Sequence, residues 1–232
     1  MLRGLFGESR RKDEGLLLEA NRAICKFINE LEAVPAKRRT EAQRRFRVWA
    51  DSFYRAIDEL EQSEYAAVQY ARLVKSRYVD EMNREEKDNY NRHLYYYKNA
   101  LIRLFAVLDK LGYFMNESLQ LGTERMKARF SYFTVLRNMR QHKLHPGLGL
   151  PLNEMKERFR EPVSRLRNVR NMEIHTINAD LLDDLLKAGE ARRGENLRTE
   201  IEDIPKNLDD LRQGSEMALR AVAAVFRYLP RS

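Results

Sequence analysis

The feature of this sequence that most constrains its fold is a run of apolar residues at alternating steps of three and four. The members of this run are Leu94, Tyr97, Leu101, Leu104, Leu108, Leu111 and Met115. On an α-helix this spacing keeps the apolar side chains on one continuous stripe. The run therefore predicts a long helix, beginning near Arg84, that packs lengthwise against other helices in a bundle.

Further segments with helical periodicity are expected on both sides of this helix, and no segment is convincing as a strand. The expected helices span about residues 14–33, 48–60, 64–82, 124–141, 153–175, 181–188 and 205–229. The second and third of these can be continuous. Residues 145–151, which include two prolines and two glycines, are predicted to form a loop, and residues 189–202 a polar linker.

The composition agrees with an all-α fold. Only 10 Gly and 6 Pro interrupt 232 residues, and the hydrophobic share of 43% is sufficient for a sizeable core. We expect a helical bundle over residues 84–232 and an N-terminal helical extension over residues 1–83.

The formal charge of +8 points to an anionic partner, of which nucleic acid is the most natural. The alternative is a protein whose helix faces are simply rich in Lys and Arg. Basic side chains are concentrated in residues 37–47 and 156–170. The residues that we select as candidate nucleic-acid contacts are Lys156, Arg160, Arg167, Arg137 and His142.

Other functional classes lack support in the sequence. The lone cysteine, Cys25, excludes an intramolecular disulfide and is expected to be a buried thiol. No cysteine cluster or carboxylate at diagnostic spacing accompanies His142 and His145, so neither a metal site nor a cofactor is expected. No apolar run is long enough to span a bilayer and the start lacks a signal-peptide core, which favours a cytoplasmic protein.

The densest functional chemistry lies in the segment Arg170-Asn171-Met172-Glu173-Ile174-His175. On a helix, Asn171 and His175 project from the same face, and the long side chain of Arg170 can reach toward it. The set combines a forked cation, an amide and an imidazole that exchanges protons near neutral pH. A phosphodiester is the obvious target for these groups.

This motif, Arg-Asn followed by three residues and His, resembles the signature of the HEPN (higher eukaryotes and prokaryotes nucleotide-binding) superfamily. The run Leu108-Asp109-Lys110-Leu111-Gly112-Tyr113-Phe114-Met115-Asn116 is similar to a run on an earlier long helix in one HEPN group. The resemblance covers roughly residues 85–230 and implies a HEPN-like helical bundle. HEPN proteins often act as metal-independent ribonucleases.

The resemblance implies RNA cleavage by a homodimer in which the neighbouring 2′-OH attacks the phosphorus. His175 would be the general base or acid, Arg170 would hold a phosphate oxygen, and Asn171 would orient the imidazole or contact the RNA backbone. The alternative is a catalytically inactive HEPN-like module for dimerisation or protein interaction. In that case Arg170 would pair with Glu173, and His175 would be an ordinary residue at a helix C-terminus.

The sequence contains a second copy of the motif, Arg137-Asn138-Met139-Arg140-Gln141-His142. We favour Arg170, Asn171 and His175 because they occupy the late helix on which HEPN proteins carry the signature. In the earlier copy, His142 could cap a helix or contact RNA.

Overall fold

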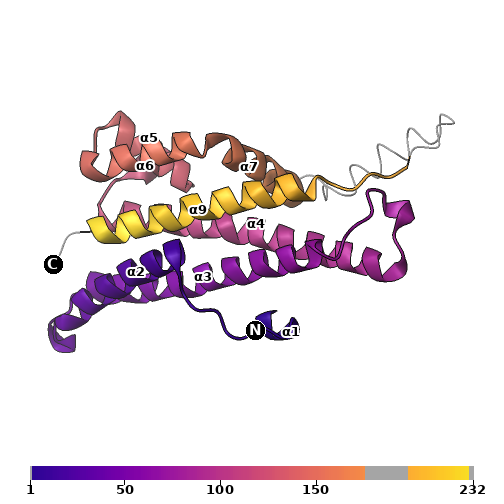
Figure 1. The fold of residues 1–232 in the computed structure, drawn as a ribbon. Coiled ribbons are helices and arrows are strands. Elements are labelled where there is room, and N and C mark those ends of the chain that lie inside the picture. The colour runs from indigo at the N-terminus through magenta and orange to yellow at the C-terminus, as the bar shows by residue number, and fades with distance from the viewer. Residues whose placement is uncertain (1, 176–197, 230–232) are drawn as a thin grey trace. The chain divides into compact units, whose positions relative to one another are not determined.

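The computed structural model describes residues 2–175 and 198–229, without the side chains of Ile174 and His175. The described residues form an all-α fold, as predicted, and their only β-type pairing is an isolated bridge between Tyr78 and Glu200. The α-helices, labelled in Figure 1, are α1 (Leu2–Leu5), α2 (Gly15–Ala33), α3 (Glu41–Ala71), α4 (Arg84–Ser118), α5 (Tyr132–Gln141), α6 (Pro146–Arg158), α7 (Arg160–His175) and α9 (Ile204–Tyr228). The predicted helix at 181–188 is outside the described residues.

The chain divides into two compact units, each assembled from three separate stretches. Unit 1 contains Met1–Glu8, Glu61–Ile102 and Glu161–Gly214, and unit 2 contains Ser9–Leu60, Arg103–Arg160 and Ser215–Ser232. The long helices α3, α4 and α9 therefore contribute residues to both units. The Arg170 motif belongs to unit 1 and the Arg137 motif to unit 2.

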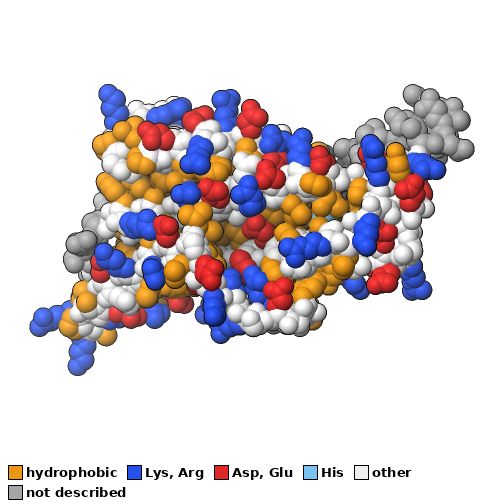
Figure 2. Space-filling view, in the orientation of Figure 1, with side chains coloured by type: hydrophobic (Ala, Val, Ile, Leu, Met, Phe, Trp, Pro, Cys, Tyr) orange, Lys and Arg blue, Asp and Glu red, His pale blue; other side chains and the backbone are white. Residues whose placement is uncertain are grey.

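The face of the molecule drawn in Figure 2 carries charges of both signs. On the face shown in Figure 2, Lys and Arg side chains are interspersed with Asp and Glu rather than gathered in one basic field.

Within residues 2–175 and 198–229, no helix has both the length and the apolar character needed to cross a membrane.

The apolar stripe on α4 is buried as predicted, from Leu94 to Met115. Phe114 precedes Met115, the last residue of this stripe, and is 0% exposed. It is the centre of an aromatic core in unit 2. The rings around Phe114, with centroids 5.0–5.9 Å away, are Phe27, Phe46, Trp49, Phe53 and Phe226. Residues from α2, α3, α4 and α9 thus meet around one ring.

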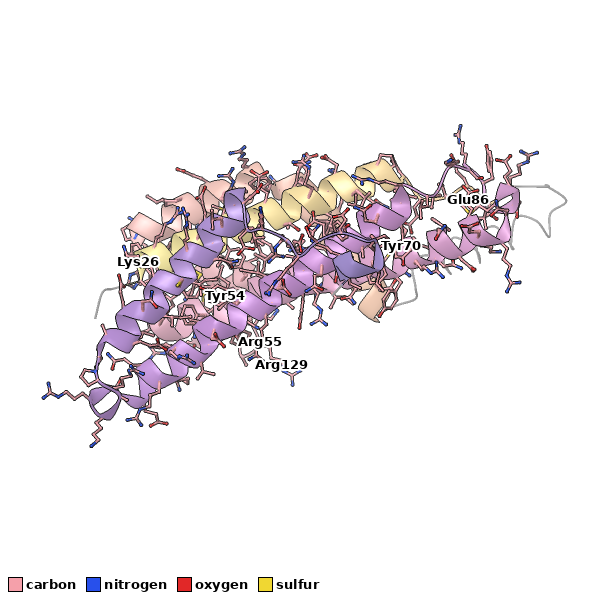
Figure 3. All side chains as sticks on the ribbon, turned by 60° about the horizontal axis from the view of Figure 1, so that its bottom comes forward. Lys26, Tyr54, Arg55, Tyr70, Glu86 and Arg129 are labelled. Atoms are coloured by element: carbon pink, nitrogen blue, oxygen red, sulfur yellow. The ribbon has the colours of Figure 1, made fainter. Side chains whose placement is uncertain are left out.

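Helix α3 combines the second and third predicted helices but ends at Ala71, well before the expected residue 82. The backbone N–H groups of Lys75 and Ser76 donate to Oε1 of Glu86 at 2.6 and 2.7 Å, and the Ser76 hydroxyl donates to Oε2 at 2.9 Å. These bonds lower the pKa of Glu86, which is labelled in Figure 3. The carboxylate replaces helical bonding in the turn after α3, so the prediction of a helix to residue 82 was wrong.

Residues 198–201 are not a detached linker, because they dock on the segment that follows α3. The Val79 N–H donates to the Thr199 carbonyl at 2.8 Å, and the Ile201 N–H donates to the Arg77 carbonyl at 3.0 Å. Val79 and Ile201, which take part in this pairing, pack against a small apolar cluster of unit 1. The cluster consists of Tyr90, Leu94 and Ile204.

The predicted loop at 145–151 was also wrong, because helix α6 begins at Pro146. A proline suits the first helical position, where its fixed φ is helical and its missing N–H has no helical partner. Leu148, Gly149 and Leu152 are buried, so packing further stabilises this glycine-containing helix. The following helix, α7, begins at Arg160 rather than near Asn153.

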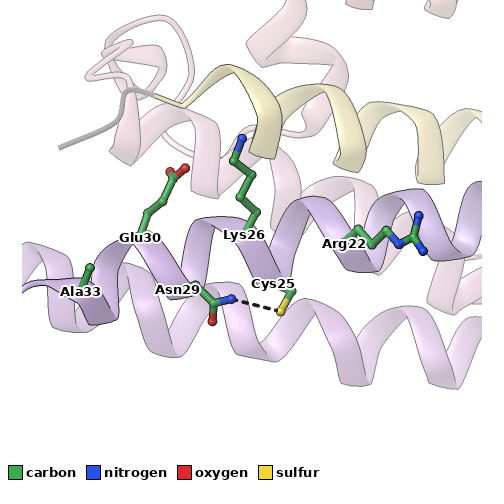
Figure 4. A pocket seen from close by; sticks show the side chains of 6 residues that line it. All are labelled: Arg22, Cys25, Lys26, Asn29, Glu30 and Ala33. Carbon is green, nitrogen blue, oxygen red and sulfur yellow. Dashed lines mark hydrogen bonds between the residues drawn. The ribbon is translucent and has the colours of Figure 1, made fainter.

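Cys25 is exposed, contrary to the prediction of a buried thiol. It follows Ile24 on α2, and one helical step of 100° moves it off the buried face. In Figure 4 it lines a shallow surface pocket on α2, and its sulfur accepts a 3.7 Å hydrogen bond from Nδ2 of Asn29.

Candidate functional site

Helix α7 carries the favoured motif and is fixed within unit 1 by two ion pairs. Arg165 donates from Nε and a terminal nitrogen to both carboxylate oxygens of Asp210 on α9, each at 2.7 Å. The Asp210 side chain is only 6% exposed, and this bidentate pair raises the pKa of Arg165. On the α4 side, Lys98 lies 3.2 Å from Glu173, and each of these side chains is 15% exposed.

The two sides of α7 differ in character. Pro162, Val163 and Leu166 are buried, whereas Arg167 and Asn171 are exposed. Position 175 is one helical turn beyond Asn171 and therefore belongs to the same side of the helix. Arg170 is half-buried. The arrangement leaves the amide of the motif accessible and anchors the helix through its other side.

The earlier copy of the motif has the opposite orientation. Arg137 and His142 are exposed, whereas Asn138 is 2% exposed. The Asn138 amide donates at 3.0 Å to both the Leu121 carbonyl and the Thr123 hydroxyl. Asn138 therefore fastens α5 to the segment after α4, and its amide is unavailable for a ligand.

This difference predicts unequal effects of one substitution at the two asparagines. Asn138→Ala should lower the free energy of unfolding by about 2 kcal/mol, because it leaves a buried carbonyl and hydroxyl without their donor. Asn171→Ala should change it by less than about 0.5 kcal/mol, since the residue is exposed. Urea denaturation followed by circular dichroism measures both, and equal losses would contradict the structural role of Asn138.

Four of the candidate nucleic-acid contacts belong to unit 2, on or next to the packed helices α5 and α6. Lys156 pairs with Glu157 at 3.1 Å, and Arg160 lies 3.9 Å from the same carboxylate. Lys156, Arg160 and Arg140 together lower the pKa of Glu157. This acid offsets part of the local positive charge, so a count of cations alone overstates that charge. Arg167, the fifth candidate, is on α7 in unit 1.

The run Leu108–Asn116 builds the junction between α4 and α5. Oδ1 of Asp109 accepts the first N–H of α5, from Tyr132, at 3.2 Å. Oδ1 of Asn116 accepts the Thr123 N–H at 2.8 Å. Burial lowers the pKa of Lys110, whose Nζ donates to the Ser52 carbonyl at 3.4 Å. These polar residues thus serve the fold, a role that reading the run as a family signature did not identify.

No metal site accompanies these groups in residues 2–175 and 198–229, where no group of three or more His, Cys, Asp and Glu side chains could hold an ion. His145, one of the histidines considered as a ligand, instead contacts the Tyr228 hydroxyl through Nδ1 at 3.3 Å.

The chain has an all-α fold with the Arg-Asn-…-His segment on a late helix, which is the arrangement expected of the HEPN class. The model of the HEPN_Cthe2314-like HEPN family matches residues 49–230, and the chain belongs to this family. The match begins within α3, ahead of the stretch in which we noted the resemblance. Comparisons with curated proteins and with solved structures give no match.

Proposed function

We propose that this protein is a metal-independent endoribonuclease that acts as a homodimer, with Arg170, Asn171 and His175 at its site. The observation that carries the proposal is the presence of these three residue types, at HEPN spacing, on α7 of a HEPN family member. The ion pairs of Arg165 and Glu173 support it, because a fixed helix keeps catalytic groups in register.

In the proposed reaction, His175 removes the proton of the 2′-OH, and the 2′ oxygen attacks the adjacent phosphorus. The bond from phosphorus to the 5′ oxygen breaks, the leaving oxygen takes up a proton from water, and the protonated His175 returns its proton to water. The products are a 2′,3′-cyclic phosphate and a 5′-hydroxyl. Arg170 stabilises the charge on the non-bridging oxygens, and Asn171 orients the imidazole.

Two copies of α7 would face one another in the homodimer and provide two sets of these groups. Lys156, Arg160, Arg167, Arg137 and His142 would then contact RNA phosphates. Because such contacts release counterions, RNA affinity should fall steeply as salt concentration rises.

The proposal predicts cleavage of a mixed-sequence RNA by the purified protein in the presence of EDTA. His175→Ala should slow cleavage at least about 100-fold, because it removes the proton-transferring group. Arg170→Ala should have a comparable effect through lost charge stabilisation. Gel electrophoresis of end-labelled RNA measures the rate, and chemical probing of the new termini identifies the cyclic phosphate.

His142→Ala is the matched control, because His142 ends the second copy of the motif and is exposed. Its cleavage rate should fall by no more than about threefold, the loss of one phosphate contact and far less than the effect of His175→Ala. Equal cleavage by wild type and His175→Ala would refute the catalytic assignment. Absence of cleavage by the wild type would favour the inactive module for dimerisation or protein interaction.

A further inference from the structure

We propose that the exposed ring of Tyr113 and the loop of residues 124–129, here called the basic loop, form a separate contact site for single-stranded nucleic acid. The inference rests on the proposed function in that it takes nucleic acid as the ligand. It concerns unit 2, whereas the Arg170 motif belongs to unit 1.

Tyr113 provides an aromatic surface that is both exposed and supported. Its ring stacks on that of Phe130, with centroids 4.4 Å apart and planes inclined by 30°. Phe130 is buried, whereas Tyr113 remains 40% exposed. A ring held in this way can stack on a base at little cost in side-chain entropy.

The basic loop leads directly into Phe130, on which the Tyr113 ring stacks, and it carries three cations. All six of its residues are exposed, and they include Arg125, Lys127 and Arg129. None of the three cations forms an ion pair or a side-chain hydrogen bond with a residue that the structure describes. Arg129 immediately precedes Phe130, and its side chain extends away from the helices in Figure 3. These cations are therefore available to the phosphates of a strand, and Arg129 is next in sequence to the residue that supports the Tyr113 ring.

Both ends of the basic loop are fixed. At its start Thr123 is fully buried and bonded to Asn116 and Asn138. At its end Phe130 is buried, and the Tyr132 N–H is bound by Asp109. A short loop anchored on both sides loses little conformational freedom when it binds a ligand.

The acids around this surface have partners of their own. Glu117 pairs with Arg45 at 2.9 Å, and Oε2 of Glu124 accepts a 2.9 Å hydrogen bond from the Asn116 amide. That bond lowers the pKa of Glu124, which is the one acid in the basic loop. Cations consequently outnumber acids three to one in the loop.

The combination of ring and cations favours a single strand over other anions. A single strand offers unstacked bases and phosphates together, whereas a duplex hides its base faces. An acidic peptide would use the cations but would leave the ring of Tyr113 without a role. The chemistry is shared by RNA and DNA single strands, so the test includes both.

The test measures binding by fluorescence anisotropy, with all variants made in a His175→Ala background so that RNA remains intact. The probe is a labelled single-stranded RNA of roughly 15 nucleotides. Tyr113→Leu should weaken binding about tenfold by removing the stacking ring, whereas Tyr113→Phe should keep affinity within about twofold. Lys127→Gln with Arg129→Gln should lower the slope of log affinity against log salt by about 1.4, the loss of two phosphate contacts.

The matched charge control is Arg22→Gln with Lys26→Gln, two exposed cations on α2 that should leave the salt slope unchanged. The DNA version of the probe should bind with similar dependence on Tyr113. Unchanged binding by Tyr113→Leu, equal affinity for duplex RNA, or competition by polyglutamate as strong as by RNA would each overturn the site. Absence of RNA cleavage by the wild-type protein together with Tyr113-dependent binding would refute the catalytic proposal alone, and cleavage by the wild type without such dependence would refute only this site.

Discussion

Phe114→Ala is expected to lower the free energy of unfolding by about 4 kcal/mol, the middle of the range for a buried phenylalanine. Phe114 is 0% exposed and lies among five aromatic rings from α2, α3 and α9. The alanine variant loses these contacts at once, and several helices would have to move together to close the cavity. Urea denaturation monitored by far-UV circular dichroism measures the loss.

The control for Phe114→Ala is Tyr95→Ala on the same helix. Tyr95 is 63% exposed, so its truncation should cost less than about 1 kcal/mol. Phe114→Leu, which keeps part of the apolar volume, should give an intermediate loss. Similar losses for Phe114→Ala and Tyr95→Ala would show that the ring cluster does not hold the helices of unit 2 together.

The parts of the fold that the sequence predicted well depend on local periodicity. The stripe from Leu94 to Met115 identified α4, and every member of it is buried. The spacing of apolar residues also located α2 and α9 to within a few residues. In these helices one face packs along its full length, so the pattern of side chains reports burial directly.

The parts that were predicted wrongly depend on distant partners or on glycine and proline in an unusual setting. Helix α3 ends at Ala71 because Glu86, on the next helix, binds the backbone that follows. Residues 146–151 are helical because Pro146 occupies the first turn and Leu148 and Leu152 are buried. No short-range pattern in the sequence indicates the contact of Glu86, whereas Pro146 at a helix start and the i, i+4 spacing of Leu148 and Leu152 are local signals of a helix.

In the candidate site, too, the local features were predicted from the sequence and the contacts with distant partners were not. The sequence located the Arg170 motif on a helix, and the structure shows Asn171 exposed on that helix. The sequence alone could not separate the two motif copies by environment, because Asn138 is buried by partners at Leu121 and Thr123. It also missed the pairing of Arg165 with Asp210, whose residues are far apart in the chain.

The run Leu108–Asn116 connects the resemblance to the fold, and Gly112 is its most demanding position. A Cβ at this residue would lie 2.8 Å from the Tyr132 Cα and 2.9 Å from its backbone nitrogen. Gly112→Ala should therefore lower the free energy of unfolding by about 2–3 kcal/mol, because α4 and α5 must separate to admit the methyl group. Alanine is the better helix former by about 1 kcal/mol, so helix propensity alone predicts the opposite sign.

Steric contact and helix propensity thus predict opposite signs for the change in the free energy of unfolding of Gly112→Ala. Gly147→Ala, measured alongside, is the control. A Cβ at Gly147, in the first turn of α6, would meet only Cε2 of Tyr228, at an ordinary 3.5 Å. That variant should be neutral or up to about 1 kcal/mol more stable by urea denaturation. Gly112→Ala should also weaken the bond from the Tyr132 N–H to Asp109, since both depend on the same close approach. A stabilised Gly112→Ala variant would mean that α4 and α5 do not make this backbone contact.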